Sequence, residues 1–526
     1  MSVSLDRRRF LGTALAGAAI VAFDPLRGGW VTAAEAAEGT PRGAVTVPDL
    51  DGELSTDPAV LAAAADDFGH LVHRTPLAVL RPGSVDDVVA LVRYANRHGI
   101  AVSMRGQGHS TNGQSQVRAG VVIDSSTLDQ VHEIGADRVT ADAGVLWIDL
   151  ARATLAHGLT PPVLTDYLDL SVGGTLNAGG IGGTTQRVGM QVDNVLALEV
   201  VTGRGELVSC SPTRNRALFE AVLGSLGQLA IVVRATIRLV PAPTHARTYQ
   251  LFYSDLDTYL ADQRRALAEG RFTSLEGQVQ RTAADDGWEF FIDAAVYYTD
   301  TPPDDAGVTG GLRFDPARTV SEDVTFLDWI DRLRPTVELL IQLGVWFLPH
   351  PWINLFLPAS RTAAVVAPTL ADLTLADTGM GPVLLYPFRP GLVRRRFVQT
   401  PDEPVAFLFA ILRTTAPPTD PAAQVADNRA LYERARAVGG KRYPVGSVPF
   451  SPLDWIAQYG RDYPAFAAAK ARLDPPPGAR ARAGHLRPTA LTPRGGTHGA
   501  DPGSRSAEAV GVRSAGRVGP TGGPPV

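Results

Sequence analysis

The most regular pattern in the sequence is a helical spacing of apolar residues between Val85 and Gly99. Ser84 stands at the expected N-cap and Gly99 at the expected end, so the segment predicts a helix with one buried face. A second helix is expected over 147–157. Apolar and β-branched runs predict short strands at 77–80, 101–104, 121–123 and 139–141. This mixture of short strands and helices predicts an α+β fold.

The later part of the sequence shows two changes of character. Strands are expected over 195–201 and 230–239, and Pro241-Ala242-Pro243 then marks a boundary. Beyond the boundary, aromatic runs predict separate strands at 288–291 and 295–298. From residue 475 the sequence is rich in Pro, Arg and Gly and has no aromatic residue, so we expect a disordered tail over 475–526.

Two glycine-rich stretches interrupt these elements. Residues 105–110 read Arg-Gly-Gln-Gly-His-Ser directly after a predicted strand, and backbone N–H groups of such a loop can bind a pyrophosphate. The loop does not fit the G-x-G-x-x-G pattern that opens a helix, because residues 110–113 continue as a turn. Taken alone, His109 is equally well an ordinary loop histidine. The second stretch, 171–183, has too many glycines for a stable helix or strand, so we expect backbone that approaches another group closely.

The N-terminus has the features of an export signal. Arg7-Arg8-Arg9-Phe10-Leu11-Gly12 precedes an apolar stretch over 13–23 and small residues over 33–37, which predicts a twin-arginine signal over 1–37. The apolar stretch is shorter than the ~20 residues of a membrane span, so an anchor helix is the less favoured alternative. Because this route carries folded proteins, the expected location is extracellular or in the cell envelope, and a cofactor bound before export is indicated.

Composition narrows the classes of partner. The protein has 526 residues, enough for two or three domains of the usual size. A net charge of -5 provides no broad basic surface and argues against nucleic acid as a partner. Cys210 is the only cysteine, which excludes an intramolecular disulfide and a multi-cysteine metal site. We expect Cys210 to be a small buried side chain, and we assign no metal.

Several segments together resemble the cytokinin dehydrogenases, which belong to the vanillyl-alcohol-oxidase/para-cresol-methylhydroxylase-type (VAO/PCMH) superfamily of FAD-binding proteins. The matching segments are 165–168, 172–176, 194–195, 200–206, 210–212, 222–228, 275–277, 349–356 and 381–387. The resemblance spans about residues 70–474, and Pro349-His350-Pro351-Trp352 is its most specific part. It implies a two-domain flavoprotein, with a VAO/PCMH-type FAD-binding domain over 50–242 and an α+β substrate domain with an antiparallel sheet over 243–445. Residues 446–474 would return to the FAD-binding domain.

The resemblance implies a covalent cofactor. His109 matches the histidine that bonds to the 8α methyl of FAD. The matching pyrophosphate loop consists of Arg105, Gly106, Gln107, Gly108, Ser110 and Gln114. Further FAD contacts are implied for Asp166, Ser171, Asn177, Ile181 and Val232. Related enzymes of the berberine-bridge type add a cysteine link, but Asp169 stands near that place, so a single histidyl link is expected.

The resemblance also implies a reaction and its residues. Asp166 matches the carboxylate that hydrogen-bonds the side-chain amine of an N-isoprenoid adenine while a hydride passes to FAD, and a carboxylate in a dry pocket is a suitable base. The resulting imine would hydrolyse to adenine and an aldehyde. Glu276 matches a glutamate at the mouth of the pocket, and Trp352 an aromatic residue that shapes it. The alternatives remain a turn residue for Asp166, a solvated strand residue for Glu276 and a core residue for Trp352.

The sequence departs from the family near its C-terminus. Residues 448–455 keep Trp455 but lack the usual tyrosine, and Tyr443 is the nearest one upstream. The usual ending after Pro475 is absent, which suggests a reading-frame shift in the tail. Two other functions therefore stay open: an FAD-linked oxidase of sugars, polyols or aromatic alcohols, and a non-catalytic secreted flavin-binding protein. We expect a monomer that acts on a small molecule and uses an electron acceptor of unspecified identity.

Overall fold

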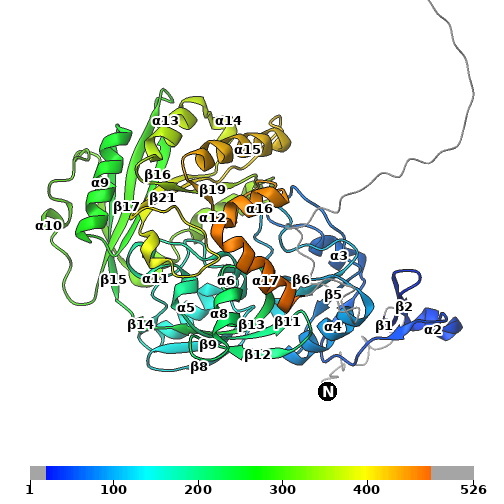
Figure 1. Ribbon diagram of the computed structural model, residues 1–526. Helices are drawn as coiled ribbons and strands as arrows, with labels where there is room; N and C mark the ends of the chain where they lie inside the picture. The colour runs from blue at the N-terminus through cyan, green and yellow to red at the C-terminus, as the bar shows by residue number, and fades with distance from the viewer. Residues whose placement is uncertain (1–18, 475–526) are drawn as a thin grey trace, which may run out of the picture. The chain divides into compact units, whose positions relative to one another are not determined.

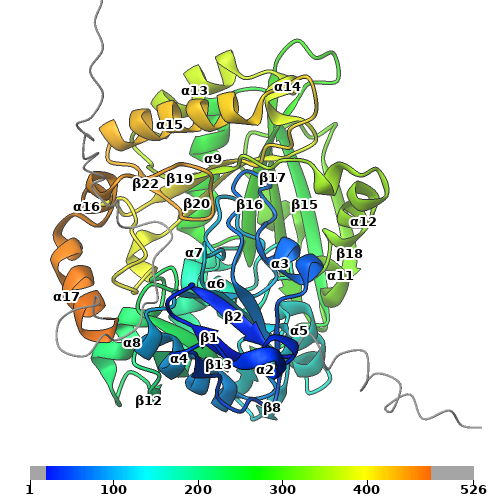
Figure 2. The same cartoon turned by 90° about the vertical axis from the view of Figure 1, so that its right-hand side faces the viewer.

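Five sheets organise residues 19–474, the part of the protein that the computed structural model describes. Figures 1 and 2 show these sheets and the helices that cover them. Strands and helices of both domains are mixed along the sequence, and the largest sheet is antiparallel, so the predicted α+β class is confirmed. Within residues 19–474, no helix is both long and apolar enough to cross a membrane.

A four-stranded sheet carries the first glycine-rich loop. Its order is β4 (Glu53–Ser55), β5 (Ala78–Arg81), β7 (Val121–Asp124) and β6 (Val102–Arg105), with α3 (Pro58–Ala64) and α4 (Val85–His98) nearby. The predicted helix α4 forms because Val88, Leu91 and Ala95 share a buried face, and it ends at Gly99 with a φ of 68°. Ser84 does not cap it, because the Ser84 hydroxyl donates to Asp51 instead, over 3.0 Å.

A five-stranded antiparallel sheet completes the N-terminal half. Its order is β12 (Leu207–Cys210), β11 (Val195–Thr202), β13 (Ala230–Arg238), β9 (Arg138–Asp142) and β8 (Val131–Ile134). The helices in this part are α5 (Trp147–Leu155), α6 (Val172–Ala178), α7 (Thr185–Val188) and α8 (Arg216–Val222). A two-stranded sheet, β10 (Leu159–Thr160) with β14 (Val240–Pro241), lies at the predicted boundary. Cys210 is buried in the apolar core, as expected.

Helix α6 corrects one prediction, since residues 172–178 are helical despite two glycines. Glycine has a low helix propensity, so this helix is stabilised by its tertiary packing and not by its own residues. A Cβ atom on Gly173 would lie 2.7 Å from the Cβ of Ala143, and one on Gly174 would lie 2.8 Å from the Ser171 hydroxyl. The expectation of a close backbone approach was therefore right, and the expectation of irregular backbone was wrong for these seven residues.

An eight-stranded antiparallel sheet dominates the second domain. Its order is β18 (Val320–Thr325), β15 (His245–Tyr253), β17 (Trp288–Tyr298), β16 (Ser274–Arg281), β20 (Val383–Phe388), β21 (Ala406–Ile411), β19 (Ile353–Pro358) and β22 (Lys441–Arg442). The two aromatic strands predicted over 288–298 are one continuous strand, β17, because every residue between them pairs with β15.

Both faces of the large sheet are covered. Phe407 and Phe409 of β21 point into a core beneath α9 (Leu256–Glu269), α13 (Thr362–Asp372) and α15 (Pro421–Ala437). The alternate residues Ala406, Leu408 and Ala410 join the core shared with the first domain. Successive strand residues point to opposite faces, so a strand buried on both sides reads as a continuous apolar run. One face of the sheet therefore supports the first domain and the other supports three helices.

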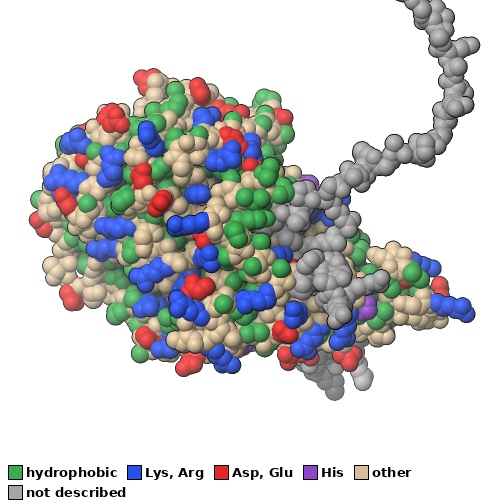
Figure 3. Space-filling model, in the orientation of Figure 1, with side chains coloured by type: hydrophobic (Ala, Val, Ile, Leu, Met, Phe, Trp, Pro, Cys, Tyr) green, Lys and Arg blue, Asp and Glu red, His purple; other side chains and the backbone are tan. Residues whose placement is uncertain are grey.

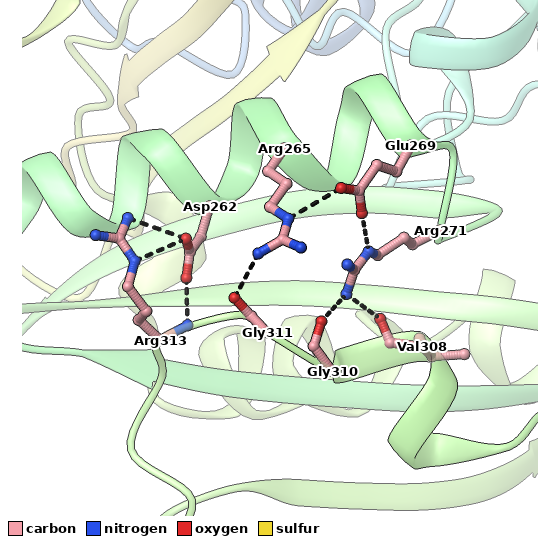
Figure 4. Close-up of polar contacts among 8 residues, drawn as sticks. All are labelled: Asp262, Arg265, Glu269, Arg271, Val308, Gly310, Gly311 and Arg313. Carbon is pink, nitrogen blue, oxygen red and sulfur yellow. Dashed lines mark hydrogen bonds and ion pairs between the residues drawn. The ribbon is translucent and has the colours of Figure 1, made fainter.

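Helix α9 is tied to the segment that follows α10 (Asp305–Thr309). Figure 4 shows this set of polar contacts. Arg265 donates to the carbonyl of Gly311 over 2.6 Å, and Arg271 donates to the carbonyl of Gly310 over 2.7 Å. The guanidinium of Arg313 donates to Asp262 over 3.1 Å. These contacts hold the segment over 310–313 against α9 and the residues that follow it.

Residues 20–32 of the predicted export signal form a small sheet with residues 45–46. Strands β1 (Ile20–Asp24), β2 (Gly29–Thr32) and β3 (Val45–Thr46) pair, and α2 (Ala33–Gly39) follows β2. Trp30 of β2 stacks on Tyr94 of α4, with ring centroids 6.4 Å apart. The arginines at 7–9 lie outside the described residues, as does the tail over 475–526. The export signal, the tail's disorder and its frame shift therefore stay predictions.

The last described residues pack back on the first domain. Helices α16 (Pro452–Tyr459) and α17 (Tyr463–Leu473) bury Trp455, Tyr459 and Phe466 in the shared core. The N–H of Gly203 donates to the carbonyl of Leu473 over 3.1 Å. Figure 3 shows positive and negative side chains interspersed over the face that it presents.

Candidate active site

The loop after β6 is shaped by its glycines. Gly108 has a φ of 64°, and a Cβ atom there would lie 2.3 Å from the Arg105 guanidinium. A Cβ atom on Gly106 would lie 2.0 Å from the Ser171 hydroxyl. Any larger residue at these two positions would push the loop away from its neighbours. The loop is also anchored at Ser110, whose hydroxyl donates to Asp67 over 2.9 Å.

Four aromatic rings surround the His109 side chain. Its ring centroid lies 4.0 Å from that of Phe68 and 5.0 Å from that of Tyr167. The rings of Trp352 and Trp346 follow at 5.5 and 5.8 Å. Burial, together with the nearby His350, lowers the pKa of His109 to about 3. At neutral pH His109 is therefore a neutral imidazole with one nitrogen lone pair free of a proton.

Three cavities follow the loop from Gly106 to His109. A cavity of about 80 Å³ is lined by Gly106, Gln114, Asn177 and Val232, together with the α6 glycines. Another of about 240 Å³ touches Arg105, Gly106 and Gln107. The third, of about 410 Å³, lies beside Arg105, Gln107, Gly108 and His109. The three cavities share Arg105, Gly106 or Gln107 as lining residues, and most of the sequence-predicted cofactor residues border this row of cavities, the cofactor groove.

This groove fits FAD. Its smallest cavity is lined by glycines that allow close approach, and its largest is lined by His109. Within residues 19–474, the indole N–H of Trp352 is buried beside His109 without an acceptor. A buried donor without a partner is uncommon in a native protein and is consistent with a bound polar group. Ser171 contacts Gly106 at the groove, whereas Ile181 is buried next to the hydroxyl of Tyr443.

Two sequence-predicted acids meet at a separate cavity. Asp166 lies in the loop after β10, and Glu276 lies on β16. Arg332, which follows α11 (Phe326–Ile330), donates from Nη2 to Asp166 over 2.9 Å and to Glu276 over 2.7 Å. All three residues line a cavity of about 430 Å³. Burial, and then the charge of Asp166, raise the pKa of Glu276 well above its ordinary value.

Arg332 was not expected from the sequence. Its partners lie 166 and 56 residues away, so no local spacing signals the contact. Trp352 was expected to shape the substrate cavity, and the structure places it beside His109 and away from the cavity of Asp166 and Glu276. The ring of His350 stacks on that of Phe68, with ring centroids 4.0 Å apart.

Residues 443–447, at the start of the predicted return segment and just before it, contact both glycine-rich stretches. The hydroxyl of Thr111 donates to the carbonyl of Val445 over 2.9 Å, and the hydroxyl of Ser447 donates to the carbonyl of Thr111 over 2.6 Å. The hydroxyl of Tyr443 accepts from the N–H of Gly180 over 3.0 Å. Tyr443 therefore supports the second glycine-rich stretch from within the core.

The fold and the groove define a flavin-dependent oxidoreductase with a PCMH-type FAD-binding domain. Residues 76–211 match the family model of an FAD binding domain, and residues 282–477 match the model described as "Cytokinin dehydrogenase 1, FAD and cytokinin binding". The protein belongs to the cytokinin dehydrogenase family. The resemblance inferred from the sequence is thereby confirmed.

Individual relatives cover most of the sequence. Cytokinin dehydrogenase 5 of Oryza sativa subsp. japonica is 36% identical over 478 residues, covering 81% of this protein and 89% of the relative. Cytokinin dehydrogenase 2 of Arabidopsis thaliana is 34% identical over 463 residues, covering 81% and 92%. An uncharacterized oxidoreductase, ORF5 in the fasciation locus of Rhodococcoides fascians, is 40% identical over 427 residues, covering 81% and 97%.

Proposed function

We propose that the protein oxidises the C–N bond that joins an isoprenoid substituent to adenine, and that hydrolysis of the imine then releases adenine and an aldehyde. The observation that carries this proposal is the acid pair of Asp166 and Glu276 in the wall of the 430 Å³ cavity. Oxidation of an amine needs a group that accepts a proton from nitrogen. An alcohol oxidase would also need a proton acceptor, so the match to cytokinin dehydrogenases favours the amine substrate over an alcohol.

FAD is the cofactor of the proposed reaction, and the groove along residues 105–114 would hold it. When bound, FAD accepts a hydride from the substrate carbon. We propose a covalent link through His109, because its imidazole is neutral at neutral pH and fixed by four aromatic rings. The backbone N–H groups of the loop would bind the pyrophosphate, as anion-binding loops do.

The two acids would have different roles in proton transfer. Asp166, paired with Arg332, is the carboxylate that accepts a hydrogen bond and then the proton from the substrate amine. Glu276 is more deeply buried, and burial raises its pKa well above its ordinary value, so it is the acid of the pair that holds a proton more readily. Phe326, Ile330 and Leu164 line the same cavity, and their apolar surfaces exclude water from the amine.

The route out of the cell is part of the proposal. The arginine-rich start of the sequence supports export by the twin-arginine route after folding, which would place the enzyme outside the cell or in its envelope. A covalent link would prevent loss of FAD there. The small-molecule substrate and an electron acceptor are then the partners that the reaction requires.

A substrate comparison tests the proposed function. The purified full-length protein is mixed with a coloured artificial electron acceptor and with isopentenyladenine, glucose or benzyl alcohol in parallel. We expect the acceptor to lose its colour with isopentenyladenine alone, and we expect adenine as the product. Turnover with glucose or benzyl alcohol and none with isopentenyladenine would favour the oxidase alternative. A protein that contains flavin but turns over none of the three compounds would favour a binding role.

A further inference from the structure

One guanidinium group, that of Arg332, donates hydrogen bonds to both Asp166 and Glu276. Arg332 Nη2 contacts both acids, at 2.9 and 2.7 Å, while its Nη1 donates to the carbonyl of Trp329 over 3.3 Å. The Arg332 guanidinium carbon also lies 4.2 Å from the centroid of the Trp329 ring. Trp329 is itself held, because its indole N–H donates to the hydroxyl of Tyr297 over 3.0 Å. The position of the guanidinium is therefore fixed by contacts other than those to the acids.

More acidic groups than the two that Arg332 contacts directly surround its guanidinium. Asp293 of β17 is the cross-strand partner of Glu276 on β16, so three carboxyl groups face one arginine. The phenols of Tyr297 on β17 and Tyr386 on β20 also interact with the cluster, and Arg187 lines the same cavity. Burial raises the pKa of Asp293 as well as that of Glu276. Burial opposes the charge on Arg332, but Glu276, Asp166 and Asp293 together raise its pKa.

We propose that Arg332 is a positioning residue that holds the Asp166 carboxylate in the cavity wall as the proton acceptor and directs the shared proton of the acid pair to Glu276. This inference rests on the proposed function. Asp166 is the more exposed acid, with 24% of its side chain accessible against 8% for Glu276, so a negative charge costs less at Asp166. Without the guanidinium, the acid pair loses the cation that favours its negative charge, so the pair binds protons more tightly.

Kinetics of two substitutions test this role. In Arg332→Met, we expect kcat for isopentenyladenine to fall about tenfold or more, with a smaller change in KM, because a proton acceptor is lost for most of the molecules. The acid limb of the kcat/KM profile should move up by about one pH unit or more, since a neighbouring cation is removed. Arg332→Lys, which keeps the positive charge, should restore much of kcat and return the acid limb most of the way to its original pH. An acid limb that stays in place in Arg332→Met would overturn the proposal.

Arg247 provides a matched control. It also bridges two acids, Asp305 and Asp323, and 22% of its side chain is exposed against 20% for Arg332. Arg247 lies on β15, away from the cavity. Arg247→Met should lower the unfolding temperature and leave the pH profile unchanged. If it shifted the acid limb as far as Arg332→Met does, the effect would be a general consequence of destabilisation and the proposal would fail.

A measurement without substrate separates this inference from the proposed function. Removal of Arg332 makes the folded state bind more protons than the unfolded polypeptide, so stability is lost as pH rises. Between about pH 5 and pH 8, the unfolding temperature of Arg332→Met should therefore fall more steeply than that of the unchanged protein. Adding Glu276→Gln should remove the extra slope. Equal slopes with and without Arg332 would overturn the inference, even if isopentenyladenine were a good substrate.

Discussion

His109 combines a neutral ring with a fixed position. Its pKa is lowered to about 3, so the ring stays unprotonated over the whole physiological range, and four aromatic side chains restrict its orientation. A reactive nitrogen must be both unprotonated and correctly placed. The environment of His109 thus meets both requirements for the proposed covalent bond.

We predict that His109→Ala removes the covalent flavin and leaves the fold intact. The histidine ring contributes little to the main cores, whereas the proposed link depends on it entirely. After denaturation in acid, the flavin absorbance of the unchanged protein should stay with the polypeptide, and that of His109→Ala should pass into the soluble fraction. His157→Ala, at an exposed histidine, serves as the control. Flavin that remained attached in His109→Ala would refute the assignment.

Asp166 carries the proton transfer in the proposed reaction. We predict that Asp166→Asn lowers kcat for isopentenyladenine by about 10²- to 10⁴-fold, because an amide does not accept the proton. Asp331→Asn is the control, since Asp331 forms ion pairs with Arg334 and Arg152 outside the cavity. Steady-state kinetics of the two variants check the prediction. A kcat for Asp166→Asn within a few-fold of the unchanged protein would exclude Asp166 as the proton acceptor.

Residues differ in how far the sequence reveals them. The loop over 105–110 could be identified because its glycines and histidine are consecutive, and a short pattern carries the geometry. Asp166 and Glu276 could be named only through the family resemblance. Arg332 could not be identified at all, because the three residues come from separate elements and meet only after the sheet and α11 pack together.

At the level of elements, tertiary packing determined the secondary structure of segments whose local sequence pattern did not predict it. The amphipathic helix α4 was predictable because its buried face repeats at helical spacing. Helix α6 was not, because its glycines oppose a helix locally, and only contact with Ala143 shows why they are needed. The same contact brings the α6 backbone to the smallest cavity of the cofactor groove.

Gly173 provides a test at this scale. We predict that Gly173→Ala destabilises the protein by about 1–3 kcal/mol, since the added methyl group overpacks against Ala143. Gly391→Ala is the matched control, because nothing lies within 4 Å of the position of its added Cβ. Denaturant unfolding of both variants measures the effect. An unfolding free energy unchanged in Gly173→Ala would mean that α6 and Ala143 are not in close contact.

At the level of the whole molecule, the cofactor groove and the acid pair depend on both domains. The loop over 105–113 is held by Val445 and Ser447 from far along the sequence, and Arg332 reaches Asp166 from the second domain. Two domains with an antiparallel sheet in the second could be inferred from the resemblance. The contacts that hold the loop could not, because they join residues more than 300 positions apart.

Export by the twin-arginine route involves the whole folded protein. We predict that replacing Arg7, Arg8 and Arg9 with lysine retains the flavin-containing protein inside the cell, since the twin-arginine pair is the recognised feature. Assay of the culture medium and envelope fractions for the protein checks this. Mass measurement of the exported form should show cleavage within or just after residues 33–37. Equal export of the lysine variant would refute the twin-arginine route.

The most direct test of the proposed function is a single turnover without oxygen. The full-length protein with its flavin oxidised is mixed with an equimolar amount of isopentenyladenine, and the flavin absorbance and the products are followed together. The proposed function predicts that the flavin absorbance bleaches and that one adenine and one unsaturated aldehyde form for each flavin reduced. Unchanged flavin absorbance with intact isopentenyladenine would contradict it.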